Sequence, residues 1–348
     1  MHDAGVTQFL RYPIDQCAKP MSTRFVPGVS KSGTTTLFDA FVRPHPQLLF
    51  EQKEMHWWDN KAFDPRRTIG QLTSAYAHAS RMIVQEALNS THMRDQLVIV
   101  EGTPRTFWHG DSWTFDPLNS GLQLPAVLMP HKIRHVTPDV KFIVILRDPV
   151  RRLLSDHKYF YGGRKSSEDF HNKVVRAISW WRSCVARYPE KRCVYGLAPP
   201  GLPALDLDKC IVPQKNWTVR CIRSNEWKKN TAARLRIGLY DLFIQDWFSV
   251  FPRSQLLFLK HKELFENGTY MIQSQIYPFL DIPKLDSDRV EKMNYILSRK
   301  KATGKGNTRM MSKTSKILQE FYAPFNKRLA ETLRDEKWLF KAAASVYH

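Results

Sequence analysis

The chain has no long apolar run, and none of its apolar stretches approaches the roughly 20 residues that span a bilayer. Its N-terminal stretch also lacks the apolar core of a secretory signal. We therefore expect a soluble chain, or a fragment cut from an upstream membrane anchor. The absence of internal repeats and low-complexity segments favours a single domain at 23–348 after an irregular leader at 1–22. A stretch at 194–232 that carries proline and cysteine is expected to be an irregular insertion in that domain.

Cysteine is scarce, and the spacing of the five cysteines argues against a zinc site because no Cys-x-x-Cys pair occurs. Four of them lie between Cys184 and Cys221, which suits one or two local disulfides whose partners stay open. The odd count leaves at least one thiol free or paired outside the chain. Three Asn-x-Ser/Thr sequons, at Asn89, Asn216 and Asn267, accompany the cysteines. Together these features favour a disulfide-bonded glycoprotein of the secretory pathway.

Acidic side chains are also few: 33 Asp and Glu stand against 53 Lys and Arg, which gives a formal net charge of +20. A charge of this size attracts polyanions and speeds their encounter with the protein. Nucleic acid, an anionic polysaccharide and an acidic membrane surface are all compatible with it. The sequence has no nucleic-acid reader motif and no basic face interleaved with aromatic residues, so we expect no nucleic-acid partner.

One segment carries most of the information, Gly28-Val-Ser-Lys-Ser-Gly-Thr-Thr-Thr-Leu37. A short apolar strand is predicted before it at 23–27, and a helix is predicted to open after it and to stop at Pro44. A strand, a glycine-bounded turn and a helix N-terminus together form a phosphate cradle. The N–H groups of the turn point at the anion, and the helix dipole adds about half a positive charge.

The segment departs from the P-loop of nucleotide triphosphatases at one position. Gly28 and Gly33 have the usual spacing, but Thr34 stands where those proteins carry lysine before the residue that binds magnesium. The loop lysine is Lys31, which comes earlier. This displacement predicts a phosphate-bearing donor other than ATP with magnesium.

Short apolar strands alternate with helices along the chain, which predicts an α/β fold with a central parallel sheet flanked by helices. The strand–loop–helix around Lys31 would be its P-loop-like part. Ligand groups are expected at the carboxyl ends of the strands. The predicted strands after the first are 47–50, 97–100, 141–146 and 255–259, and the predicted helices are 69–94, the segment from 150, 170–190, 239–251 and 313–340. Residues 105–135 are predicted to be mixed, with loop signals at 116–121.

A second constellation follows the strand at 141–146. Arg147 stands at the end of that strand, and Ser155 lies about two helical turns further on. Arginine binds phosphate through two parallel hydrogen bonds, and the serine hydroxyl adds a third donor. The alternative is an ordinary surface helix start, with Arg151 and Arg152 in solvent.

Together the two motifs resemble those of the sulfotransferase family, and the resemblance extends over most of 23–340. Lys31-Ser-Gly-Thr-Thr35, with Thr36 after it, is similar to the family's 5′-phosphosulfate loop. Arg147 and Ser155 match its 3′-phosphate site, an Arg-x7-Ser pattern. The resemblance implies 3′-phosphoadenosine-5′-phosphosulfate as sulfuryl donor, the adenosine 3′,5′-bisphosphate as product, and no required metal.

Two further segments resemble parts of glycosaminoglycan sulfotransferases. Lys53-Glu-Met-His-Trp-Trp-Asp59 is similar to the segment with the catalytic base, and Glu320-Phe-Tyr-Ala-Pro-Phe-Asn326 is similar to a C-terminal signature. Both most resemble the N-acetylgalactosamine 4-sulfate 6-O-sulfotransferase group. One departure is Gly102, where heparan enzymes commonly have lysine, so no acceptor contact is assigned there.

The resemblance implies a role for each site residue. Glu54 is expected to take the proton of the acceptor hydroxyl, with Glu101 as the rival base, and Lys31 is expected to stabilise the leaving phosphate. His56 would bind the acceptor or orient Glu54, unless it is structural. The expected donor-binding residues are Lys31, Ser32, Gly33, Thr34, Thr35, Thr36, Arg147, Ser155, Lys305, Gly306 and Arg309, of which the last three are expected in a late loop over the 3′-phosphate. The expected acceptor-binding residues are Lys53, His56, Trp57, Trp58, Glu101 and Arg105, with only one of the two tryptophans on ligand.

The resemblance also implies a partner and a compartment. The partner would be an anionic glycosaminoglycan. The accepting group would most simply be the 6-OH of N-acetylgalactosamine 4-sulfate in chondroitin or dermatan sulfate. The compartment would be the Golgi lumen, reached as a type II membrane protein, or the outside of the cell. Three alternatives stay open: a heparan sulfate O-sulfotransferase, a P-loop nucleotide kinase and a polyanion-binding module. The oligomeric state is not predicted.

Overall fold

The computed structural model describes residues 23–50, 53–54, 56, 58, 70–71, 74, 97–110, 113, 116–160, 166–195, 210–211, 220–221, 234–299 and 308–340. Several predictions lie outside these residues and stay predictions. They are the leader at 1–22, most of the helix at 69–94, most of the insertion at 194–232, and the site residues Trp57, Lys305 and Gly306.

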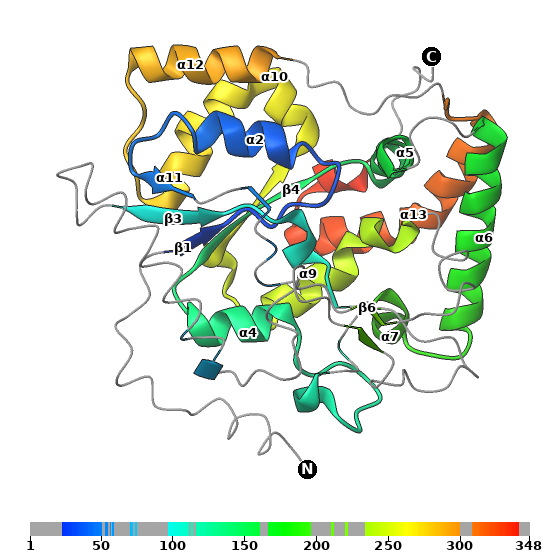
Figure 1. The fold of residues 1–348 in the computed structure, drawn as a ribbon. Helices are drawn as coiled ribbons and strands as arrows, with labels where there is room; N and C mark the ends of the chain where they lie inside the picture. Colours follow the sequence, from blue (N-terminus) through cyan, green and yellow to red (C-terminus); the bar gives the residue numbers. More distant parts are fainter. Residues whose placement is uncertain are drawn as a thin grey trace.

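Five parallel strands form the central sheet, in the order β2-β3-β1-β4-β7 (Figure 1). The strands are β1 (Thr23–Phe25), β2 (Leu48–Leu49), β3 (Val98–Glu101), β4 (Lys141–Leu146) and β7 (Leu256–Lys260). Strand β1 pairs with β3 on one side and with β4 on the other, so connections leave it in both directions. Such a reversal of strand order opens a crevice at the carboxyl ends of the strands. The predicted α/β class with a central parallel sheet is confirmed.

Strand β4 explains why the sheet needs cover on both faces. Phe142, Val144 and Leu146 belong to one buried apolar cluster. Ile143 and Ile145, which alternate with them, belong to a second cluster on the opposite face. After Lys141 the strand is apolar and buried at every position, so it has no face for solvent, and this predicts helices on both sides.

Helices pack on both faces of the sheet (Figure 1). On one face lie α2 (Thr34–Phe41), α10 (His261–Met271), the π-helical turn η9 (Ile272–Ile276), α11 (Tyr277–Leu280) and α12 (Ser287–Ser298). On the other lie α4 (Met129–Val136), α5 (Pro149–Phe160), α6 (Ser167–Val185), α7 (Glu190–Val194), α9 (Tyr240–Phe248) and α13 (Ser312–Leu333). Short 3₁₀ turns η3 (Pro104–Phe107), η5 (Pro117–Asn119), η7 (Leu235–Gly238), η8 (Arg253–Gln255) and η10 (Glu336–Leu339) connect them.

The cysteine-bearing region contains two local features. A disulfide joins Cys184 of α6 to Cys193 of α7, in agreement with the expected local pairing. Strands β5 (Cys210–Ile211) and β6 (Arg220–Cys221) form a small antiparallel pair inside the predicted insertion, and Cys210 stands opposite Cys221 in the backbone register.

The structure differs from the sequence prediction at two places. Helix α4 begins within 105–135, which was predicted only as a mixed segment, and ends at Val136. Its buried residues Met129, Ile133 and Val136 have helical spacing. In the sequence Pro130 suggests the end of a helix, but in the structure it lies in the first helical turn, where proline is compatible with the helix. Helices α10, α11 and α12 fill a region for which no element was predicted. Across the described residues, no helix combines the length and the apolar character needed to cross a membrane.

Candidate active site

The loop between β1 and α2 is shaped by two glycines. A Cβ on Gly28 would collide with the Thr34 Cγ2 methyl and would lie 2.9 Å from Ile145 Cγ2, so the backbone passes too close to β4 for any side chain. Gly33 has φ 86° and directly precedes α2, in the left-handed region that favours glycine. Lys31 shares this conformation with φ 70°. The loop therefore turns tightly at the carboxyl end of β1.

The N-terminus of α2 faces the pocket that this loop borders. The helical ladder begins with the Leu37 N–H, which donates to the Gly33 carbonyl at 3.0 Å. The N–H groups before it have no acceptor within the helix, because a helix leaves its first turn unpaired. Thr34, Thr35 and Thr36 line the pocket here. The arrangement offers backbone donors and a positive dipole end to an anion.

Lys31 supplies a cation in the same place. Its ammonium nitrogen lies 3.7 Å from the centroid of the Tyr159 ring. Partial burial lowers the pKa of Lys31, while Asp156 opposes this effect and Arg147 adds to it. The ammonium is thus held in a half-buried position with both cations and carboxylates around it.

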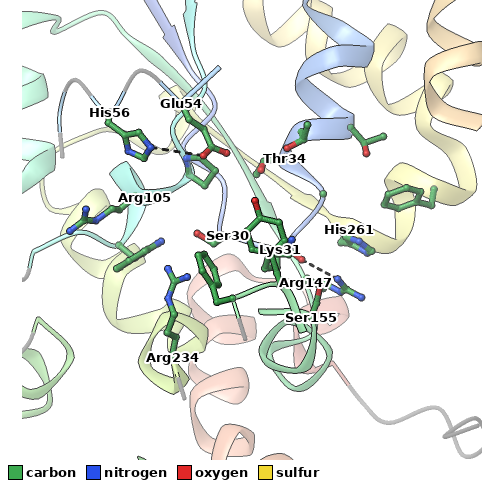
Figure 2. A pocket seen from close by; sticks show the side chains of 18 residues that line it. Ser30, Lys31, Thr34, Glu54, His56, Arg105, Arg147, Ser155, Arg234 and His261 are labelled. Carbon is green, nitrogen blue, oxygen red and sulfur yellow. Dashed lines mark hydrogen bonds and ion pairs between the residues drawn. The ribbon is translucent and has the colours of Figure 1, made fainter. Parts of the chain in front are cut away.

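Arg147 and Ser155 meet the loop from the other side of the crevice, at the end of β4 and on α5 (Figure 2). The Arg147 guanidinium donates to the carbonyl oxygen of Lys31 at 3.0 Å. The hydroxyl of Tyr240 donates to the Arg147 carbonyl at 2.8 Å. Burial lowers the pKa of Arg147 from a value so high that the group stays cationic. The Ser155 hydroxyl oxygen is buried and has no hydrogen-bond partner within the described part of the chain.

A buried network of ion pairs and hydrogen bonds stabilises α5, the helix that carries Ser155. Arg152 is completely buried and lies 3.5 Å from Asp156, which also accepts from Arg234 at 3.2 Å. Arg152 in turn donates to the Arg234 carbonyl at 2.8 Å. The alternative of two solvated arginines therefore holds for the exposed Arg151 but not for Arg152. Arg152 joins α5 to the segment that carries Arg234.

Glu54 and His56 form the opposite wall, beyond the carboxyl end of β2 (Figure 2). The Glu54 side chain is 44% exposed and accepts a hydrogen bond from the Lys53 ammonium. The Nε2 atom of His56 lies 4.0 Å from the other carboxylate oxygen of Glu54. The His56 N–H donates to the Thr103 hydroxyl at 3.1 Å, which ties this segment to the loop after β3. A carboxylate is thus presented to the pocket and held on two sides.

Other predicted site residues do not line the pocket. Glu101 is buried and accepts hydrogen bonds from the hydroxyl of Thr103 and, at 3.2 Å, from its N–H. Ser32 and Trp58 are fully buried. Lys53 contacts Glu54, a residue of the pocket lining, through its ammonium group. The N–H of Arg309, an exposed residue, donates to the Ser167 hydroxyl at 3.0 Å, and Arg309 does not line the pocket.

The pocket has a volume of about 850 Å³, which suits a ligand of nucleotide size. Among the predicted site residues it brings together Lys31, Gly33, Thr34, Thr35, Thr36, Glu54, His56, Arg105, Arg147 and Ser155. The pocket is also lined by residues that were not predicted from the sequence: Ser30, Pro104, Trp108, Tyr159, Phe160, Arg234, His261 and Phe265.

Some of the missed residues had a readable signal. His261 directly follows the carboxyl end of β7, where ligand groups are expected, and Tyr159 lies one helical turn after Ser155 on α5. Burial lowers the pKa of His261 to about 3, and Arg147 and Arg151 contribute to the shift, so this imidazole is neutral near pH 7. Within the described ranges, no group of three or more His, Cys, Asp or Glu side chains is placed to hold a metal ion.

Comparison with known proteins identifies the family of the chain. Residues 23–334 match the family model of the sulfotransferase domain. The chain is 31% identical to carbohydrate sulfotransferase 15 of Rattus norvegicus over 340 residues, which cover 91% of this chain and 54% of that protein. The human protein of the same name is 30% identical over 341 residues, with the same coverage. The chain thus spans about half the length of these curated relatives.

More distant likenesses agree. Heparan sulfate glucosamine 3-O-sulfotransferase 3A1 of Mus musculus is 22% identical over 350 residues, which cover 93% of this chain and 66% of that protein. A sulfotransferase of Alicyclobacillus acidocaldarius has a solved structure that superposes with a TM-score of 0.51 at 16% identity, covering 91% of this chain and 98% of that one. This last likeness supports the fold alone. Because the family model covers most of the chain and relatives at 30% identity or more cover nearly all of it, the chain belongs to the sulfotransferase family.

Proposed function

We propose that this protein transfers a sulfuryl group from 3′-phosphoadenosine-5′-phosphosulfate to a hydroxyl of a glycosaminoglycan. One observation carries the proposal. Two anion-binding positions, the N-terminus of α2 with Lys31 and the pair Arg147 and Ser155, lie in one pocket with the carboxylate of Glu54. The hydrogen bond from Arg147 to the Lys31 carbonyl fixes the two positions relative to each other.

The residues present fit the donor. The unpartnered buried hydroxyl of Ser155 offers a hydrogen bond to the 3′-phosphate beside the cationic Arg147. The side-chain-free backbone at Gly28 and the free N–H groups at the start of α2 offer a close approach to the 5′-phosphosulfate. The donor supplies an activated sulfuryl group on a phosphate leaving group. Ser32, which is buried in the same loop, would support the loop from behind.

The proposed roles follow from where each side chain lies. Glu54 accepts the proton of the attacking hydroxyl, since it is the only acidic residue of the described chain that lines the pocket. Lys31 places its ammonium where negative charge grows on the bridging oxygen of the leaving phosphate. His56, 4.0 Å from Glu54, orients the carboxylate or hydrogen-bonds the acceptor. Glu101 is the weaker candidate for the base because it is buried and engaged by Thr103.

For the acceptor we propose the 6-OH of N-acetylgalactosamine 4-sulfate in chondroitin or dermatan sulfate. The segments around Glu54 and Tyr322 support this choice by resemblance. The identity to the heparan sulfate relative, 22% against 31% for carbohydrate sulfotransferase 15, does not favour a heparan acceptor. A heparan sulfate acceptor is the alternative. The formal net charge of +20 is compatible with either polyanion.

We further propose that the protein acts in the Golgi lumen or outside the cell. The Cys184–Cys193 disulfide supports an oxidising compartment, where such bonds persist. The three sequons support the same placement.

A radiolabelled transfer assay tests the proposal. The protein is incubated with [³⁵S]-labelled donor and with chondroitin, dermatan and heparan chains, and the products are digested to disaccharides. We expect label at position 6 of N-acetylgalactosamine 4-sulfate, at the same rate with and without EDTA. Label in heparan alone would show that the acceptor is heparan sulfate and not chondroitin or dermatan sulfate. Failure to label any chain, combined with magnesium-dependent phosphate transfer from ATP, would favour the nucleotide kinase instead.

A further inference from the structure

Two arginines lie beside one tryptophan on one wall of the pocket, away from Arg147 and Ser155. The guanidinium carbons of Arg105 and Arg234 lie 5.9 Å and 5.3 Å from the centroid of the Trp108 ring. Arg234 also lies 4.5 Å from the ring of Phe160. Figure 2 shows Arg105 and Arg234 on one side of Lys31, and Arg147 and Ser155 on the other. The pocket thus has two separate cationic ends.

The lining residues at this second end carry a surplus of positive charge, although Arg234 is ion-paired with Asp156, a buried residue that does not line the pocket. Burial lowers the pKa of Arg234, and the neighbouring cations Arg152, Arg105 and Arg236 contribute to the shift against the opposing effect of Asp156. Of the acidic residues in the described ranges, Glu54 alone lines the pocket, against Lys31, Arg105, Arg147 and Arg234. An anion bound between the two arginines would relieve the repulsion, because each guanidinium can donate two parallel hydrogen bonds to an oxyanion.

Trp108 adds a further donor. It lines the pocket although only 6% of its surface is exposed, and its indole N–H has no hydrogen-bond partner in the described part of the chain. A buried polar group without a partner costs free energy that a ligand oxygen would recover. Two guanidinium groups and one indole N–H are the donors expected around an oxyanion.

We propose that Arg105, Arg234 and Trp108 bind an anionic group that the acceptor already carries before the transfer. This inference rests on the proposed function. The donor's anions occupy the start of α2 with Lys31 and the pair Arg147 and Ser155, so this end of the pocket is left for the acceptor. The bound group is an oxyanion close to the reacting hydroxyl, either a sulfate ester or a uronic acid carboxylate. A reaction that installs this anion must then precede the step catalysed here.

The test compares variants across matched acceptors. Arg105→Gln, Arg234→Gln and Trp108→Phe are assayed on chondroitin 4-sulfate oligosaccharides, on their desulfated forms and on their carboxyl-reduced forms. We expect each arginine variant to lose about tenfold or more in kcat/KM on the oligosaccharide with the recognised anion, the scale of one hydrogen bond to a charged group. On the form that lacks this anion, the variant and the wild type should differ by less than about threefold. The KM for the donor should not change.

Two controls separate recognition from general effects. Arg176→Gln removes one charge from an exposed position on α6 outside the pocket, and it should behave as wild type on every acceptor. Arg105→Lys keeps the charge but loses the paired hydrogen bonds, so it should recover only part of the activity. Arg234→Gln also removes the ion pair with Asp156 and can disturb the fold there. Trp108→Phe keeps an aromatic ring and leaves that ion pair in place, so it tests the site independently.

The pattern across acceptors decides the outcome. Selective loss on the sulfated forms identifies a sulfate, and selective loss on the carboxylated forms identifies a uronic acid. Equal loss on all acceptors overturns the proposal. If the wild type transfers to no acceptor, the proposed function fails; affinity of the same oligosaccharides for wild type and Arg105→Gln, measured by calorimetry with adenosine 3′,5′-bisphosphate present, then decides the inference alone. Equal affinities there would also overturn it.

Discussion

At the residue scale, Glu54 is a carboxylate held in a strained and accessible position. Its φ of 65° and that of His56, 53°, are both in the left-handed region, which non-glycine residues adopt at a cost. The Lys53 ammonium and the His56 imidazole lie on either side of its two oxygens. Such a segment keeps its shape only where the surroundings enforce it, and the hydrogen bond from His56 to Thr103 is one such constraint.

Glu54→Gln should therefore remove the base while keeping the shape of the site. We expect the rate of sulfate transfer to fall roughly 100-fold or more, the range that general base catalysis contributes. Affinity for adenosine 3′,5′-bisphosphate should stay within about twofold, since no donor contact is changed. The measurement is the initial rate with labelled donor, with calorimetry for the nucleotide.

Glu101→Gln is the matched control, because its amide oxygen can still accept from Thr103. It should keep most of the activity. A variant pair in which Glu101→Gln is inactive and Glu54→Gln is active would assign the base to Glu101.

Ser155→Ala tests the second anion position. The hydroxyl has no protein partner among the described residues, so its removal should not change the melting temperature noticeably. Affinity for adenosine 3′,5′-bisphosphate should fall about tenfold, the scale of one hydrogen bond to a charged group. Affinity for adenosine 5′-phosphosulfate, which lacks the 3′-phosphate, should not change. Equal losses for both nucleotides would remove Ser155 from the 3′-phosphate site.

The residues that line the pocket differ in how far sequence could reveal them. Lys31, Arg147 and Ser155 were predictable because each belongs to a short motif at the end of an apolar strand. Arg234 and Trp108 were not, because their proximity is created by the fold between segments far apart in the chain. Trp58 and Glu101 belong to predicted motifs but are buried and do not line the pocket. A motif does not reveal which side of a loop faces the pocket.

At the element scale, the site depends on how the β1–α2 connection turns. Gly33 adopts a left-handed conformation with no room to spare, because an added Cβ would lie 3.2 Å from the His261 ring. Gly121 has a similar φ of 74° but faces open space. A substitution at Gly121 therefore costs only backbone strain, whereas the same substitution at Gly33 adds crowding against His261.

Gly33→Ala and Gly121→Ala should thus have different consequences. Both should lose about 1 kcal/mol of stability, the cost of a non-glycine residue in the left-handed region. Only Gly33→Ala should also weaken the binding of adenosine 3′,5′-bisphosphate, by about tenfold or more, because the start of α2 must shift away from His261. Thermal unfolding and nucleotide titration measure the two effects. Unchanged nucleotide affinity in Gly33→Ala would argue against a donor at this helix.

The elements themselves followed the sequence where one signal dominated. Strand β4 was predicted with its correct bounds because an unbroken apolar run follows Lys141 and ends before Arg147 and Pro149. Helix α4 was missed because Pro130 masks a short buried stripe. Helix α13 was predicted although Pro324 lies inside it, because its apolar spacing continues over many turns.

At the scale of the whole molecule, stability should depend on pH through partly and fully buried histidines that are neutral in the folded state. The pKa of His261 is lowered to about 3 by burial, with Arg147 and Arg151 adding to the shift, against 6.5 in the unfolded chain. Between these values the unfolded chain binds a proton that the folded chain excludes. The contribution of His261 is therefore complete above pH 6.5 and is lost as the pH falls toward 3.

His261→Gln should flatten this dependence. We expect its melting temperature to fall less than that of the wild type between pH 7.5 and pH 5, measured by differential scanning calorimetry without nucleotide. The residual slope belongs to other groups, including His45, His131 and His135, whose pKa values burial also lowers. Parallel curves for the two proteins would show that His261 is not neutral in the folded state.

The proposed activity requires a nucleotide that bridges α2 and α5 across the carboxyl ends of β1 and β4. A crystal structure of the chain with adenosine 3′,5′-bisphosphate tests this most directly. We expect the 5′-phosphate at Lys31 and the backbone of Thr34 to Thr36, and the 3′-phosphate at Arg147 and Ser155. A nucleotide bound elsewhere, with this loop free of phosphate, would contradict the account.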